Sequence, residues 1–279
     1  MDGKLATVLS IEGRALDVVA SAPQTITPDE ARELLATQVQ NRPMSKAVIS
    51  QYARDMRNGH WRLTGAPIAF DWHGHLIDGQ QRLQAVIVAD TPTQFFVATG
   101  LDPASQNNID RGRKRTLANQ FAIFGEKDTL RLAAIVNGVW QFRNGTTGTY
   151  DLPTFEEAYE LFQSDPEGFR AATKATSLFN KSILTSKAKT VGVAMYLFTA
   201  IDSEDTFDFF NKLREGLFTE KTDPLYKLNE ALKSEALAST RHTDKYMLAI
   251  FIKAWNAYRS QTHIKVLTLK GRERFPEPL

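Results

Sequence analysis

The segment 78–82, which reads DGQQR, has the composition of a phosphate-binding site. An apolar pair precedes it and an apolar helical pattern follows it, which predicts a strand that turns through Gly79 into a helix. The N–H groups and the dipole at the start of such a helix favour an anion. Gly79 lets a ligand oxygen approach the backbone, and Arg82 can bring its planar fork to the same anion. Gln80 and Gln81 add neutral donors.

Asp78 is the candidate for chemistry in this segment. Its carboxylate repels a phosphate unless a divalent cation bridges the two, and Mg²⁺ commonly takes one or two carboxylates together with phosphate oxygens and water. We therefore predict Asp78 as a Mg²⁺ ligand and, together with Arg82, as a catalytic residue. A structural interpretation stays open, in which Asp78 caps the helix, Gly79 only makes the turn, and Arg82 pairs with an acid.

A basic cluster follows in the segment 109–116. Charges close to a predicted helix start can contact phosphate, whether it belongs to a nucleotide or to DNA. The residues predicted to flank the phosphate pocket are Asp110, Arg111, Arg115 and Thr116. Those predicted to contact nucleic acid are Arg113 and Lys114. The alternative for the whole cluster is a solvated surface.

The elements that must position these residues can be expected from local patterns. Segment 27–30 reads as a capping box with proline at the first helical position, and Ser45 starts a second helix that ends near Gly59. Short strands are expected at 67–71, 76–77 and 93–99. Most of the chain after about Thr116 has a helical pattern, with helices at 128–143, 154–163, 187–201, 204–217, 223–236 and 243–260 and a short strand at 266–269.

These patterns predict an α+β fold, in which a small mixed sheet with helices is followed by an all-helical C-terminal extension. Segment 125–128 interrupts two helices, so the domain boundary is expected there, with domains at 1–125 and 126–279.

Composition narrows the classes of function. The chain has 279 residues, 42% hydrophobic and 24% charged, which is typical of a soluble globular protein. The net charge of +2 is too small to indicate a nucleic-acid binder by itself. The absence of cysteine excludes disulfides, thiolate metal sites and a cysteine nucleophile. No apolar run is long enough to span a bilayer and the N-terminus lacks signal-peptide features, so no membrane association and a cytoplasmic location are expected.

The stretch 67–117 resembles the ParB/sulfiredoxin superfamily, and in particular its phage and DndB-like members. In those members the box reads Asp-Gly-Gln-His-Arg, so Gln81 stands in place of the usual histidine. The similarity extends over roughly residues 40–120. It includes the segments Asn41-Arg42-Pro43, 59–63, 68–71, 100–102, 109–112 and 115–116.

The resemblance implies a nucleotide pocket in which the box contacts the phosphates of ATP, CTP or a diphosphate, with Mg²⁺. The absence of cysteine excludes sulfiredoxin chemistry, and the lack of a doubled arginine disfavours a ParB-type clamp. We expect an NTP-dependent phosphotransferase, that is a kinase, or an NTPase in phage DNA modification or DNA metabolism. If the protein is phage-encoded, its location is the host cytoplasm.

Two alternatives from other classes stay open. The first is a non-catalytic DNA-binding or regulatory protein that uses the box for a backbone phosphate. The second is a binder of host or phage proteins with a degenerate site. The oligomeric state is left open.

Overall fold

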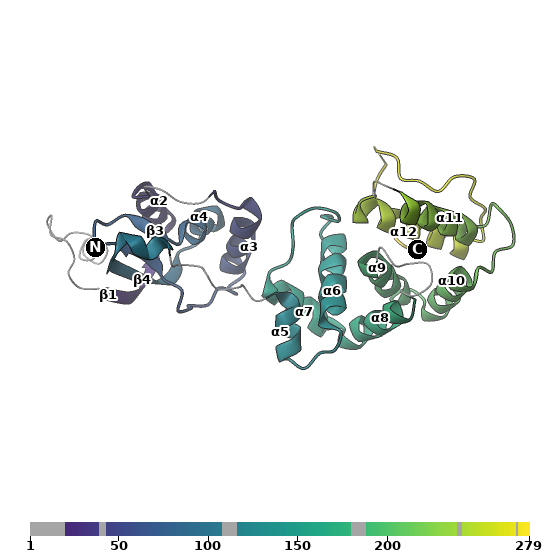
Figure 1. The fold of residues 1–279 in the computed structure, drawn as a ribbon, viewed down its shortest axis with the longest axis horizontal. Coiled ribbons are helices and arrows are strands. Elements are labelled where there is room, and N and C mark those ends of the chain that lie inside the picture. The colour runs from purple at the N-terminus through teal and green to yellow at the C-terminus, as the bar shows by residue number, and fades with distance from the viewer. Residues whose placement is uncertain (1–19, 39–42, 108–115, 180–187, 239–241, 272) are drawn as a thin grey trace. The chain divides into compact units, whose positions relative to one another are not determined.

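The computed structural model describes residues 20–38, 43–107, 116–179, 188–238, 242–271 and 273–279 (Figure 1). The contacts divide the chain into two compact units, 1–114 and 115–279. The first contains a mixed sheet with helices and the second is helical, which confirms the predicted α+β class. None of the described helices has both the length and the apolar composition needed to cross a bilayer.

Among the described residues, the N-terminal unit holds a four-stranded sheet with the order β1-β4-β2-β3. Strand β4 (Thr93–Leu101) pairs antiparallel with β1 (Ala20–Ile26) and parallel with β2 (Ile68–Asp71). Strand β3 (Leu76–Asp78) pairs antiparallel with β2. Sequence reasoning missed β1, because its sequence ASAPQTI lacks an alternating apolar pattern and contains a proline.

Among the described residues of this unit, three α-helices share one buried core with the strands. Helices α2 (Pro28–Ala36) and α3 (Lys46–Arg57) both pack against α4 (Gln80–Ala89). The predicted caps are confirmed: Thr27 and Glu30 form a capping box on α2, and the Ser45 side chain caps α3. A short 3₁₀ helix, η1 (Pro103–Asn107), follows β4. The packing of these elements fixes the positions of β3 and of the start of α4.

In the second unit, all the regular structure that the described residues form is helical. Its helices are α5 (Leu117–Ile123), α6 (Thr129–Arg143), α7 (Phe155–Ser164), α8 (Pro166–Phe179), α9 (Ala188–Thr199), α10 (Ser203–Glu215), α11 (Pro224–Leu237) and α12 (Asp244–Arg259). Their core includes Trp255, whose ring stacks on Phe198 with 4.5 Å between ring centroids. The short strand predicted at 266–269 is wrong, because these residues form neither helix nor strand.

Helix α8 was missed because its buried face contains threonine. Thr173 and Thr176 are 5% and 1% exposed, and each donates its hydroxyl to the carbonyl four residues earlier, Phe169 and Ala172 respectively. This bond satisfies the hydroxyl inside the helix and lets a polar residue occupy an apolar position. An apolar pattern read from the sequence does not reveal such a face.

The division between the compact units falls at residues 114 and 115, ahead of the boundary expected at 125 and 126. Helix α5 lies between the two positions and belongs to the helical unit. Its Ala118 and Phe121 are buried in the second core, where the Phe121 and Phe162 rings lie 5.1 Å apart between centroids.

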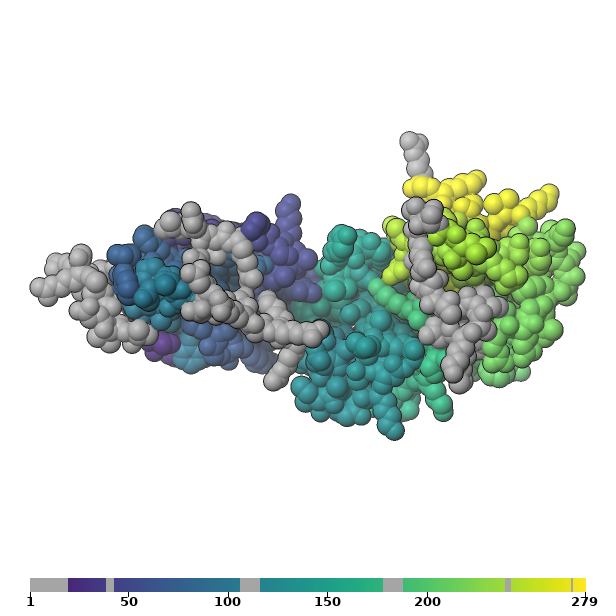
Figure 2. All heavy atoms as spheres, viewed as in Figure 1, coloured from purple at the N-terminus to yellow at the C-terminus, as the bar shows by residue number. Residues whose placement is uncertain are grey.

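The C-terminal segment covers part of the outer surface of the helical unit, where Figure 2 shows it in yellow. Its last residue accepts one hydrogen bond from α12 and donates another to it. Trp255 Nε1 donates to the Leu279 carbonyl at 3.0 Å, and the Leu279 N–H donates to Asn256 Oδ1 at 3.0 Å.

Candidate phosphate-binding turn

Strand β3 turns through Gly79 into α4, as the sequence predicts. Gly79 has φ +103, a backbone conformation that side chains disfavour. A Cβ at this position would also lie 2.5 Å from Cδ1 and 3.2 Å from Cα of Ile68 on β2. The turn therefore requires glycine both for its conformation and for the close approach of β2.

The Asp78 carboxylate is engaged on both oxygens. Oδ1 accepts from the Gly79 N–H at 2.6 Å, and Oδ2 accepts from an Arg82 terminal nitrogen at 2.9 Å. The side chain is 25% exposed. Asp78 therefore stabilises the turn and forms an ion pair with Arg82. Its predicted roles in catalysis and Mg²⁺ binding stay predictions.

The Arg82 guanidinium joins α4 to the segment that precedes β2. One terminal nitrogen donates to the Ala66 carbonyl, and the other donates to the Pro67 carbonyl at 2.8 Å as well as to Asp78. The side chain is only 13% exposed. These contacts match the structural interpretation of Arg82, and its direct contact with a phosphate stays a prediction.

The start of α4 also touches the start of α3. The Ser45 N–H donates to Gln81 Oε1 at 3.4 Å, while Gln80 is buried. The N–H groups of Arg82 and Leu83 both turn back to the Gly79 carbonyl at 2.9 Å. Helix geometry directs the N–H group of Gln81, in the first turn, out of the helix end. This backbone group is the predicted anion donor that best fits the geometry.

Asp71 organises the turn that leads into β3, and sequence reasoning did not select it. Its carboxylate is buried and accepts from the N–H groups of His73 and His75 at 2.9 and 2.8 Å. His75 Nδ1 lies 3.2 Å from its other oxygen. An aspartate just before a glycine-containing turn is the sequence signal for this arrangement.

Thr116 caps α5 in the helical unit. Its hydroxyl oxygen accepts from the Asn119 N–H at 3.2 Å and donates to Asn119 Oδ1 at 2.7 Å, in a capping box. Its predicted contact with phosphate stays a prediction. The other predicted residues of this segment lie outside the described residues: Asp110, Arg111, Arg113, Lys114 and Arg115.

A metal ion would find few protein ligands at the turn. The described residues contain no group of three or more histidine, aspartate or glutamate side chains that could hold a metal ion. Mg²⁺ at Asp78 would therefore need phosphate oxygens and water for its other ligands, as Mg²⁺ commonly does.

Comparison of the chain with protein-family models, with curated proteins and with solved structures found no match, so the resemblance to the ParB/sulfiredoxin superfamily stays a prediction from the residues.

Proposed function

We propose that the N-terminal unit binds the phosphate group of a nucleotide at the start of α4. The observation that carries this proposal is the turn at Gly79, where α4 begins at a left-handed glycine that has no side chain to form a cap. A helix whose N-cap residue provides no side-chain cap offers N–H donors and a partial positive charge to an anion. The main donor is the backbone N–H group of Gln81.

Asp78 and Arg82 hold this turn in place. Their pairing fixes the Asp78 carboxylate beside the N-terminus of the helix, and the contacts of Arg82 with the Ala66 and Pro67 carbonyls fix the neighbouring chain. A site that is rigid before the ligand arrives loses less entropy on binding. The carboxylate position is also the one from which Asp78 could share a Mg²⁺ ion with the phosphate.

The same proposal extends to NTP-dependent phosphotransfer or hydrolysis in DNA metabolism, with a ParB/sulfiredoxin-like N-terminal unit. Phosphoryl transfer depends mainly on positioning and charge stabilisation, which a helix N-terminus and a Mg²⁺ ion supply. Gln81, which stands where the superfamily members have histidine, cannot act as a general base. Any general base therefore belongs to the acceptor or to another residue.

The central test is a single charge change at the helix start, Gln81→Glu. A carboxylate in the first turn stabilises α4 through the helix dipole by about 0.3–1 kcal/mol. It also keeps an oxygen for the Ser45 N–H. Because the new charge repels a phosphate, we expect the variant to bind ATP or CTP with Mg²⁺ at least about tenfold more weakly, a change of about 1.4 kcal/mol. Isothermal titration calorimetry measures the affinity, and thermal unfolding measures the stability.

Gln84→Glu is the matched control, since it makes the same change one turn further along α4. We expect its nucleotide affinity to stay within about twofold of the wild type. The helix dipole acts on charges within the first turn, and residue 84 lies beyond the helix end where the phosphate is proposed to bind. In the wild type, a nucleotide at about 100 times its dissociation constant should stabilise the fold by about 2.7 kcal/mol.

If both variants weakened nucleotide binding equally, the effect would come from overall charge, and the proposal would be contradicted. The absence of binding by ATP, CTP and their diphosphates at millimolar concentration would also contradict it. DNA binding with a steep dependence on salt, without nucleotide binding, would assign the same turn to a backbone phosphate instead.

A further inference from the structure

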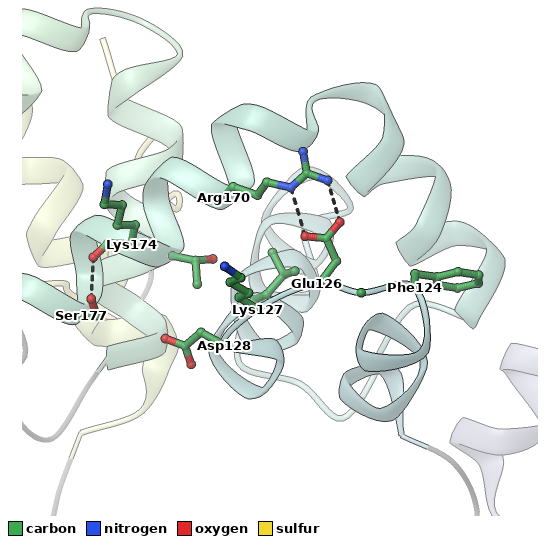
Figure 3. A pocket seen from close by; sticks show the side chains of 10 residues that line it. Phe124, Glu126, Lys127, Asp128, Arg170, Lys174 and Ser177 are labelled. Atoms are coloured by element: carbon green, nitrogen blue, oxygen red, sulfur yellow. Dashed lines mark hydrogen bonds and ion pairs between the residues drawn. The ribbon is translucent and has the colours of Figure 1, made fainter.

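A cavity of about 580 Å³ lies within the helical unit, between α8 and the loop that joins α5 to α6 (Figure 3). Small-molecule sites commonly measure about 300–1,000 Å³, so its size suits a small ligand. Buried Leu132 and Thr173 line it, together with Phe124, which is 54% exposed. The Phe124 ring is held by Phe155, on which it stacks with 6.2 Å between centroids.

Arg170 and Glu126 form one wall of the cavity and are joined by two hydrogen bonds. Arg170 Nε donates to Glu126 Oε2 at 3.0 Å, and a terminal nitrogen donates to Oε1 at 2.6 Å (Figure 3). The Glu126 side chain is 11% exposed, and hydrogen bonding by Arg170 holds the pKa of this carboxyl below its ordinary value. The other Arg170 terminal nitrogen pairs with Glu167 at 2.6 Å. Arg170 therefore compensates the charge of Glu126, the carboxylate that lines the cavity, whereas Glu167 lies outside the lining with its side chain 86% exposed.

Two lysine side chains remain at the cavity after these pairs are formed. Lys127 lies on the loop side and Lys174 on the α8 side (Figure 3). Asp128 pairs with Arg131, and neither lysine makes an ion pair within the part of the chain that the structure describes. The nearby hydroxyls are used inside α8: Thr173 donates to the Phe169 carbonyl, and Ser177 donates to the Lys174 carbonyl. The groups left for recognition are the two ammonium groups and the apolar surface.

We propose that this cavity binds a small organic anion, in which a phosphate or carboxylate group is carried on an apolar, ring-sized body. The ammonium groups of Lys127 and Lys174 take the anionic group by charge-assisted hydrogen bonds. The surfaces of Leu132 and Phe124 take the apolar body, and burial of that body adds to affinity. The site belongs to the helical unit and uses none of the residues of the turn at Gly79.

The test uses the full chain and four probes: phenyl phosphate, benzoate, phenol and inorganic phosphate. We expect phenyl phosphate or benzoate to bind at least about tenfold more tightly than phenol and than inorganic phosphate. The tighter of the two anionic probes identifies the head group. The double variant Lys127→Ala/Lys174→Ala should weaken binding of that probe by at least about tenfold, because it removes hydrogen bonds to a charged group.

The matched control is Lys221→Ala/Lys227→Ala, which removes the same charge from the same unit. Neither lysine lines the cavity or makes an ion pair among the described residues. We expect this control to keep its affinity within about twofold. Equal weakening by the two double variants overturns the proposal, and so does binding of phenol as tight as that of the anionic probes. Phenyl phosphate binding that responds to Gln81→Glu but not to Lys127→Ala/Lys174→Ala would place the ligand at α4 and also overturn it.

Discussion

Replacing Gly79 with alanine is expected to lower the free energy of unfolding of the N-terminal unit by about 2–5 kcal/mol. The left-handed conformation at φ +103 costs a side chain about 1–2 kcal/mol. The new Cβ would also overlap Ile68 Cδ1, at 2.5 Å, and forcing an extra methyl group into a packed core costs about 1–3 kcal/mol. Urea unfolding, followed by tryptophan fluorescence, measures the loss.

Gly74→Ala separates these two contributions. Gly74 lies in the turn between β2 and β3, has φ +81, and has no atom within 4 Å of an added Cβ. It should therefore show only the conformational cost of about 1–2 kcal/mol. If Gly79→Ala costs no more than Gly74→Ala, Ile68 yields to the methyl group and the close approach of β2 does not explain the glycine.

Replacing Arg82 with alanine is expected to cost about 2–4 kcal/mol of stability. The change removes the donor for the Ala66 and Pro67 carbonyls and for the Asp78 carboxylate at a site where Arg82 is only 13% exposed. Arg82→Lys should recover part of the loss, because one ammonium group cannot reach three acceptors in the geometry of a planar fork. Chemical unfolding of both variants gives the two values.

Arg32→Ala provides the control for an exposed pair in the same unit. Arg32 pairs with Asp29 on α2, where the two side chains are 54% and 90% exposed. Such a pair contributes about 0–1 kcal/mol. If Arg82→Ala lowers the free energy of unfolding no more than Arg32→Ala does but abolishes nucleotide binding, then Arg82 is a direct phosphate ligand. Its proposed role in stabilising the turn is then wrong.

Local patterns predicted much of the framework around the turn. The capping box at Thr27, the cap at Ser45 and the glycine between β3 and α4 were all correct, because each depends on residues close together in the sequence. The partners of Arg82 could not be predicted, since they depend on where the chain before β2 passes. The sequence left both interpretations of Arg82 open, and the observed contacts favour a brace.

The elements that were missed depend on tertiary contacts. Strand β1 is mostly exposed and is specified by its pairing with β4 rather than by its own apolar pattern. The buried face of α8 contains threonines, whose hydroxyls form hydrogen bonds within the helix, so this face is not marked by apolar residues alone. The cavity beside α8 was missed for a similar reason, because Lys127 and Lys174 are far apart in the sequence and line the same cavity only in the fold.

The most direct test of the central claim is an amide NMR titration of the full chain with ATP or CTP in the presence of Mg²⁺. The phosphate proposal predicts saturable shifts that are largest at the N–H groups of 79–81, that are lost in Gln81→Glu and that are kept in Gln84→Glu. Shifts confined to the cavity residues 124–128, or the absence of saturable shifts at 79–81, would contradict it.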